Sequence, residues 1–288
     1  YPTHYGGSPC GGKGMSGKPS STIGYERRYN PLLGASNLAA FQALLDETPR
    51  SAIDAILHNR NTNRGELPLP AGYGEIRAEL GAIRAFTLQQ ASALLRDGTA
   101  LIDLRDRLAF ARWHPAGALS TSYSRESLAG RVAALAAAET PLLLFADWPF
   151  LARYAASLLT AAGRNPIYGF VDATPEQWQQ ASLPGTQLDV LSVDQLHQEV
   201  MAGTASILDV RAPFELAQGA IPGAQAIPFD ELRERLHELP GHRRLVVVCE
   251  SGIRSVGSAS LLARQGFGQV AAVAPQGMSE YLKRHPAE

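Results

Sequence analysis

The chain has 288 residues, enough for two domains of ordinary size or three small ones. Hydrophobic residues make up 45%, charged residues 18%, and the formal net charge is −1. This composition allows sizeable cores and excludes a polyanion-binding surface built on excess positive charge. The longest apolar runs have the length of a strand rather than of a membrane span, and no basic run carries interleaved aromatic residues. Neither a membrane nor a nucleic acid is therefore predicted as a partner.

The two cysteines, Cys10 and Cys249, cannot form a disulfide framework. They indicate a reducing, cytoplasmic location with one or both thiols free. No signal peptide is visible, and the chain starts at Tyr1 without an initiator Met. We therefore expect the sequence to be part of a longer protein.

The first segment, residues 1–80, differs from the rest of the chain. Residues 1–34 are rich in Gly, Ser and Pro and predict a long loop. An apolar face formed by Leu38, Phe41, Leu44 and Leu45 then predicts an amphipathic helix, and a second helix is expected over about 50–58. This is too little chain for a domain with its own deep core.

An internal repeat with a period of about 105 residues organises the remainder. Its copies open at Thr87 and Ser192, each predicted to be the N-cap of a short helix ending near Gly98 or Gly203. The other matching elements are strands over 100–105 and 206–211, strands over 141–145 and 245–248, helices containing 156–159 and 259–262, and closing strands over 166–170 and 269–273.

Continuous apolar strands that alternate with helices are typical of a parallel sheet covered on both faces. The predicted fold class is therefore α/β, with two tandem domains of parallel sheet flanked by helices. Their expected boundaries are 81–183 and 184–288, joined near Leu183-Pro184-Gly185, with residues 1–80 in front.

The loop that follows the strand over 245–248 carries the candidate chemistry. Open α/β sheets bind ligands at the carboxyl ends of their strands, and Cys249 lies at that end. A helix is predicted to follow from Ser255 to Gln265, with Gly266 as its C′ residue. Backbone N–H groups of the loop and the helix N-terminus favour a thiolate and an anionic ligand, and Arg254 adds a full positive charge. The candidate site residues are Cys249 as the nucleophile and Glu250, Ser251, Gly252, Ile253, Arg254 and Ser255 as the substrate-binding loop.

The second repeat resembles the rhodanese (thiosulfate sulfurtransferase) family over residues 188–288. The resemblance rests on Leu208-Asp209-Val210-Arg211, on 219–224 and on the Cys249 loop. It implies a sulfurtransferase that carries sulfane sulfur as a persulfide on Cys249 and needs no cofactor. Thiosulfate, glutathione persulfide or another thiol persulfide would be donors, and thiols the acceptors. Two features depart from the family pattern. Ala220 stands where a His is common, and residues 274–277 replace the usual double-glycine closing turn. Both departures are expected to affect donor fit more than reaction class.

Three alternatives are open for this site. Cys249 could be a small buried core residue, and Asp209 with Arg211 is interpreted as a structural ion pair rather than a chemical group. A phosphatase of the rhodanese fold needs five residues between Cys and Arg, whereas four separate Cys249 from Arg254. A non-catalytic binding or scaffold module is the third alternative, and a homo-oligomer is compatible with the sequence.

The first repeat lacks a nucleophile, since Ala146 lies opposite Cys249 and Leu151 opposite Arg254. We interpret 81–183 as a rhodanese-like domain without sulfurtransferase activity, which serves packing or docking. A repurposed pocket around Asp147, Trp148 and Arg153 is the alternative.

Residues 1–80 resemble the last part of a metallo-β-lactamase-fold hydrolase, of the type fused to rhodanese domains in persulfide dioxygenase-related proteins. The match rests on segments 1–11 and 18–28, with His4 at the fold's last metal-motif histidine. The resemblance places the main metal motif, for a mononuclear iron or zinc, upstream of residue 1. The seven histidines of the chain are scattered without ligand spacing, so no metal site is predicted here. Cys10 is either a loop cysteine without function or a second sulfur-handling thiol.

Overall fold

The computed structural model describes residues 22–30, 33–46, 61, 64, 83–124, 127–164 and 166–286. The chain divides into two compact units, Tyr1–Gly74 and Glu75–Glu288. His4, Cys10 and the helix predicted over 50–58 lie outside the described residues.

The first unit contains two described helices, α1 (Ile23–Tyr29) and α2 (Leu38–Asp46). The prediction of a loop over 1–34 is wrong for the residues of α1, which are helical. Thr22 provides the cap that starts this helix, because its hydroxyl accepts a hydrogen bond from the N–H of Tyr25 at 3.2 Å. Helix α2 confirms the predicted amphipathic helix.

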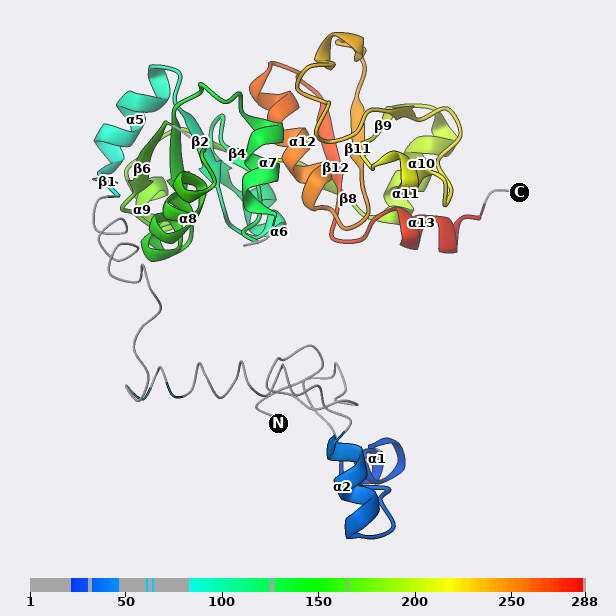
Figure 1. Cartoon of the computed structure of the whole chain (residues 1–288). Helices are drawn as coiled ribbons and strands as arrows, with labels where there is room; N and C mark the ends of the chain where they lie inside the picture. Colours follow the sequence, from blue (N-terminus) through cyan, green and yellow to red (C-terminus); the bar gives the residue numbers. More distant parts are fainter. Residues whose placement is uncertain are drawn as a thin grey trace. The chain divides into compact units, whose positions relative to one another are not determined.

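The second unit contains two five-stranded parallel sheets (Figure 1). Their strand orders are β1-β6-β5-β2-β4 and β8-β12-β11-β9-β10, so the two sheets share one topology. We call 83–186 the first sheet region and 189–286 the second sheet region. The strands of the first sheet are β1 (Ala85–Phe86), β2 (Ala100–Asp103), β4 (Leu119–Ser120), β5 (Leu142–Phe145) and β6 (Ile167–Val171). Those of the second are β8 (Asp189–Leu191), β9 (Ser206–Asp209), β10 (Gln225–Ala226), β11 (Leu245–Val248) and β12 (Val270–Val273).

Helices flank both sheets, as predicted for an α/β fold. The predicted starts at Thr87 and Ser192 are confirmed, and both are reciprocal capping boxes, with Gln90 and Gln195 as partners. The helices of the first sheet region are α5 (Leu88–Arg96), α6 (Arg107–Arg112), α7 (Leu128–Leu135), α8 (Pro149–Ala161) and α9 (Pro175–Gln180). Those of the second are α10 (Val193–Ala202), α11 (Pro213–Leu216), a 3₁₀ turn (Leu236–Glu238), α12 (Ile253–Arg264) and α13 (Met278–Arg284).

A short antiparallel pair, β3 (His114–Pro115) with β7 (Gly185–Thr186), was not predicted from the sequence. It ties the segment between the two sheets to the first sheet region. The approach is close, because a Cβ on Gly185 would lie 2.4 Å from Nε1 of Trp113.

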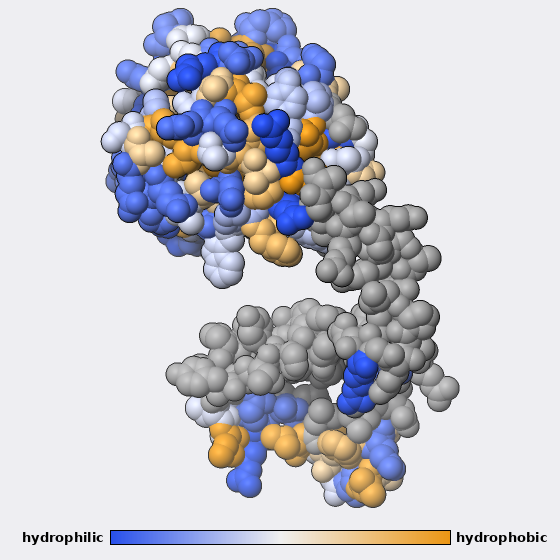
Figure 2. Space-filling view, turned by 90° about the vertical axis from the view of Figure 1, so that its left-hand side faces the viewer, coloured by the Kyte–Doolittle hydropathy of each residue, from blue (hydrophilic) through white to orange (hydrophobic). Residues whose placement is uncertain are grey.

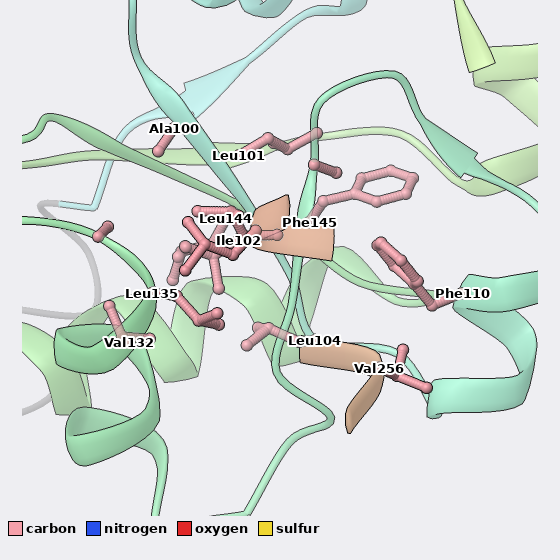
Figure 3. Packing of buried hydrophobic residues seen from close by; sticks show 14 of the residues in the cluster. Ala100, Leu101, Ile102, Leu104, Phe110, Val132, Leu135, Leu144, Phe145 and Val256 are labelled. Carbon is pink, nitrogen blue, oxygen red and sulfur yellow. The ribbon is translucent and has the colours of Figure 1, made fainter. Parts of the chain in front are cut away.

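Helix α12 lies between the two sheet regions and packs against β4, α6 and α7 (Figure 1). Its Val256 belongs to a buried cluster with Leu104 and Phe110 of the first sheet region (Figure 3). The hydroxyl of Ser260 accepts the backbone N–H of Ser120 at 3.0 Å across the same junction. The helix that follows Cys249 is therefore fixed by both sheet regions.

The second sheet buries both of its faces. Along β11, Leu245 and Val247 belong to the cluster shared with the first sheet region, whereas Val246 and Val248 belong to a separate cluster. This alternation follows the two-residue period of a strand. Both faces of the strand that leads to Cys249 are thus covered, as expected for a parallel sheet.

The face of the sheet-containing unit that Figure 2 shows carries both hydrophilic and apolar residues. Seen from the side of α5, hydrophilic residues cover much of the sheet-containing unit, with small apolar areas between them (Figure 2). Within the described ranges, no helix combines the length and apolar character needed to cross a bilayer.

Candidate functional site

Cys249 directly follows β11, a central strand flanked by β9 and β12. Three residues later the chain enters α12, with Gly252 as the N-cap residue at φ +84°. The predicted helix start at Ser255 is therefore two residues late. The left-handed conformation of Gly252 turns the chain from strand to helix within this short loop.

The sulfur of Cys249 is surrounded by hydrogen-bonding groups of its own loop. Its Sγ accepts the backbone N–H groups of Gly252 at 3.2 Å and Ser255 at 3.3 Å. The thiol also lies 3.5 Å from Oγ of Ser255, which donates to the carbonyl oxygen of Val273 at 2.8 Å. Two N–H groups at the start of a helix stabilise negative charge on the sulfur. The predicted convergence of loop N–H groups is confirmed.

Two close contacts fix the shape of this loop. A Cβ on Gly252 would lie 2.5 Å from Cβ of Ala274. A Cβ on Gly277 would lie 2.2 Å from the carbonyl oxygen of Cys249, which accepts the N–H of Met278 at 3.0 Å. The segment after β12 therefore packs directly against the loop.

A pocket of about 630 Å³ adjoins the loop and is lined by residues from both sheet regions. Of the predicted site residues, Glu250, Ser251, Ile253 and Arg254 line this pocket. Cys249, Gly252 and Ser255 are buried and joined by the hydrogen bonds given above. Other lining residues include Ser127, Gly130 and Arg131 of the first sheet region and Glu215, Phe229 and Asp230 of the second.

Arg254, which was expected from the sequence to add a full positive charge to the site, is paired with an acidic side chain. Its two terminal nitrogens each donate to one carboxylate oxygen of Glu215, both at 2.6 Å. This bidentate bond is the main cause that raises the pKa of Arg254, and it lowers the pKa of Glu215. The charge of Arg254 is therefore compensated within the pocket.

Asp209 and Arg211 form the predicted structural ion pair. They are almost fully buried, with 2.8 Å between Oδ2 and Nη2, and Arg211 also donates to the carbonyl oxygen of Gly219 at 2.7 Å. The first sheet region repeats this arrangement with Asp103 and Arg105, at 2.6 Å. In both regions the pair braces the turn after a central strand.

In the first sheet region, the residue that follows strand β5 is Ala146, which is buried. Helix α8 begins at Pro149, so this loop is one residue shorter than the Cys249 loop. Trp148 and Phe150 are exposed, and burial is the main cause that raises the pKa of Asp147.

Three charged residues that line the pocket beside the Cys249 loop were not identified from the sequence, namely Arg131, Glu215 and Asp230. Glu215 carried a local signal, because it occupies the third position of α11 and accepts the N–H of Ala212 at 2.9 Å. Arg131 carried no local sequence signal, because it lies in the other repeat. It reaches the pocket through the packing of the two sheet regions.

Comparison with known proteins assigns the second sheet region to a protein family. A family model described as "Rhodanese-like domain" matches residues 192–284. A protein named "Sulfurtransferase" from Allochromatium vinosum is 40% identical over 72 residues, which cover 24% of this chain and 67% of that protein. The "Putative sulfur carrier protein YrkF" of Bacillus subtilis is 32% identical over 104 residues, which cover 36% of this chain and 56% of that protein. The match therefore spans two thirds of the first relative and little more than half of the second.

Solved structures also show similarity to this chain. A rhodanese-related protein from Thermoplasma volcanium is 28% identical, with a TM-score of 0.31, and the match covers 34% of this chain and 93% of that chain. A thiosulfate sulfurtransferase from Pseudomonas aeruginosa is 24% identical, with a TM-score of 0.32, and the match covers 72% of this chain and 43% of that chain. At these TM-scores the family assignment rests on the sequence matches.

Proposed function

The chain belongs to the rhodanese-like family through residues 192–284, and we propose that it is a sulfurtransferase with Cys249 as its nucleophile. The observation that carries this proposal is the pair of N–H groups, from Gly252 and Ser255, that meet at the sulfur of Cys249. They suit a sulfur atom that is negatively charged as a thiolate and again as a persulfide.

In the proposed reaction the thiolate of Cys249 attacks the outer sulfur of thiosulfate. A bond forms between the two sulfur atoms, the S–S bond of the donor breaks, and its electron pair leaves with sulfite. Cys249 then carries a persulfide anion. A thiolate or cyanide attacks the terminal sulfur, and the electron pair of the broken bond returns to the sulfur of Cys249. Atoms and charge balance without a cofactor.

Glutathione persulfide and other low-molecular-weight persulfides are proposed as alternative donors, with thiols as acceptors. Their transfer follows the same steps, with a thiolate in place of sulfite as the leaving group. The pocket beside the loop supports this range, because it is lined by both apolar and charged side chains.

We propose further that the first sheet region is a second rhodanese-like copy without sulfurtransferase activity. Two observations support this proposal. Its strand order is the same as that of the second sheet, and the buried Asp103–Arg105 pair repeats Asp209–Arg211. Ala146, at the position of the nucleophile, carries no group that could hold a sulfur atom.

The assignment of residues 1–80 to the end of a metallo-β-lactamase-like domain also stays a proposal. Its motifs lie largely outside the described residues. In this proposal the rhodanese-like site exchanges sulfur with an oxygenase site of a fused metallo-β-lactamase-like domain.

Thiocyanate formation from thiosulfate and cyanide tests the proposed activity. We expect turnover in the wild type and in Cys10→Ser, and loss of turnover in Cys249→Ser. A variant without Cys249 that turns over like the wild type would overturn the assignment. Absence of turnover and of any sulfur adduct in the wild type would leave a non-catalytic binding module as the function.

A further inference from the structure

We infer that Arg131, on helix α7 of the first sheet region, is the residue that binds the anionic sulfur donor in the pocket beside the Cys249 loop. The inference rests on the proposed function and deepens it, because it assigns donor binding to the sheet region that lacks a nucleophile. Arg131 would bind the donor through its guanidinium group and takes no part in bond making or breaking.

The charges of the pocket single out Arg131. Three acidic side chains line it, from Glu215, Asp230 and Glu250, together with two basic ones, from Arg131 and Arg254. Arg254 is committed to Glu215 through both terminal nitrogens. Within the described chain, no carboxylate forms an ion pair with Arg131. It is thus the cation of this pocket whose charge is available to a ligand.

The position of the Arg131 side chain is fixed by its own sheet region. One terminal nitrogen donates to the carbonyl oxygen of Ser122 at 2.9 Å, and the side chain is half-buried. Leu128, Val132 and Leu135 anchor the same helix in the core. A guanidinium group has five N–H donors in a planar fork, so one bond to a carbonyl leaves donors for the paired oxygens of a sulfonate or a carboxylate.

The electrostatics of the pocket agree with this geometry. Burial is the main cause that lowers the pKa of Arg131, and the positive charge of Arg254 lowers it further. Negative charge on Cys249 acts in the opposite direction on both arginines. The sulfur and the two guanidinium groups therefore share one electrostatic environment, in which an anion close to Arg131 relieves an uncompensated charge.

Without Arg131 the pocket would repel the donor. Asp230 and Glu250 would then face thiosulfate, which carries two negative charges, with Arg254 already paired. The first sheet region would accordingly be needed for donor binding, although it carries no nucleophile itself.

The test compares Arg131→Gln and Arg131→Lys with Arg112→Gln, an exposed arginine of the same sheet region that does not line the pocket. We expect the KM for thiosulfate to rise about ten-fold or more in Arg131→Gln, because a charge-assisted bidentate bond is lost. Arg131→Lys should restore part of the affinity, and Arg112→Gln should match the wild type. An unchanged KM in Arg131→Gln would overturn the inference.

A second measurement separates this inference from the proposed function. Iodoacetate and iodoacetamide both react with a thiolate, but only iodoacetate carries a negative charge. The rate of Cys249 with iodoacetate divided by its rate with iodoacetamide therefore reports the anion preference of the pocket alone. Peptide mass spectrometry distinguishes Cys249 from Cys10. We expect the ratio to fall several-fold in Arg131→Gln and to change little in Arg112→Gln. An unchanged ratio, or no reaction of Cys249 with either reagent, would overturn the inference. Absence of thiocyanate formation in the wild type would instead count against the proposed function.

Discussion

Arg254 donates to both carboxylate oxygens of Glu215, at 2.6 Å each, although 39 residues separate them in the chain. This bond removes a free positive charge from the pocket beside Cys249. It also joins α12, the helix that follows Cys249, to α11, the helix that follows the Asp209–Arg211 pair. The charge available to a donor is therefore set by residues outside the Cys249 loop.

The first prediction concerns Glu215→Gln. This change frees the charge of Arg254, so we expect the KM for thiosulfate to fall roughly three- to ten-fold, equivalent to about 1 kcal/mol. Glu231→Gln is the matched control, because Glu231 pairs with Arg235 at 2.8 Å and does not line the pocket. Steady-state kinetics provide the measurement. A KM that stays the same or rises in Glu215→Gln would show that Arg254 does not act on the donor.

The second prediction concerns Gly252→Ala. The added Cβ would lie 2.5 Å from that of Ala274, so the loop must shift and its N–H can no longer point at the sulfur of Cys249. We expect sulfurtransferase turnover to fall about 100-fold, as for loss of one preorganised N–H donor. Gly266→Ala is the control, since Gly266 has φ +87° and nothing within 4 Å of the added Cβ. It should lose stability but keep its turnover number. Equal losses of turnover in the two variants would contradict the role of the loop.

The third prediction compares a buried ion pair with an exposed one. Asp209→Asn leaves the buried Arg211 uncompensated, and we expect the free energy of unfolding to fall by about 3 kcal/mol. Asp189→Asn removes a half-exposed partner of Arg244 and should cost less than about 1 kcal/mol. Urea denaturation measures both values. Similar small losses in both variants would indicate that the Asp209–Arg211 pair does not brace the fold.

The fourth prediction concerns the pH dependence of stability. Burial is the main cause that lowers the pKa of His114 from 6.5 to about 4 in the folded protein, where the ring stacks on Phe110. In the unfolded chain this residue takes up a proton as the pH falls through about 6.5, whereas the folded chain does so only near pH 4. The free energy of unfolding should therefore decrease as the pH falls between these values.

Replacement of His114 tests this origin of the pH dependence. In His114→Gln the decrease in the free energy of unfolding between pH 6.5 and pH 4 should become smaller. An equal pH dependence in the wild type and His114→Gln would mean that other groups cause it.

Much of the fold could be predicted from local sequence patterns. Thr87 with Gln90, and Ser192 with Gln195, contain their capping bonds within four residues, so the helix starts can be recognised without knowledge of the fold. The central strands are continuous apolar runs because both sheet faces are covered. By contrast, the β3–β7 pair depends on chain segments about 70 residues apart, and no local pattern signals it.

The sequence predicted the geometry of the Cys249 loop, but not the charged residues that other elements bring to the pocket beside it. The Cys249 loop is a contiguous segment, and its N–H groups converge because a strand, a left-handed glycine and a helix start follow one another. The pairing of Arg254 with Glu215 and the arrival of Arg131 depend on tertiary packing. Sequence reasoning therefore predicted the convergence of loop N–H groups near Cys249, but did not predict that Glu215 compensates the charge of Arg254.

The intact mass of the protein after incubation with thiosulfate, and separately with glutathione persulfide, tests the central proposal most directly. Wild type, Cys10→Ser and Cys249→Ser are compared before and after the addition of cyanide. We predict a gain of about 32 Da, one sulfur atom, in the wild type and in Cys10→Ser, lost on addition of cyanide and absent in Cys249→Ser. A wild-type protein that gains no sulfur from either donor, or a Cys249→Ser variant that gains as much, would contradict the assignment of Cys249 as a persulfide carrier.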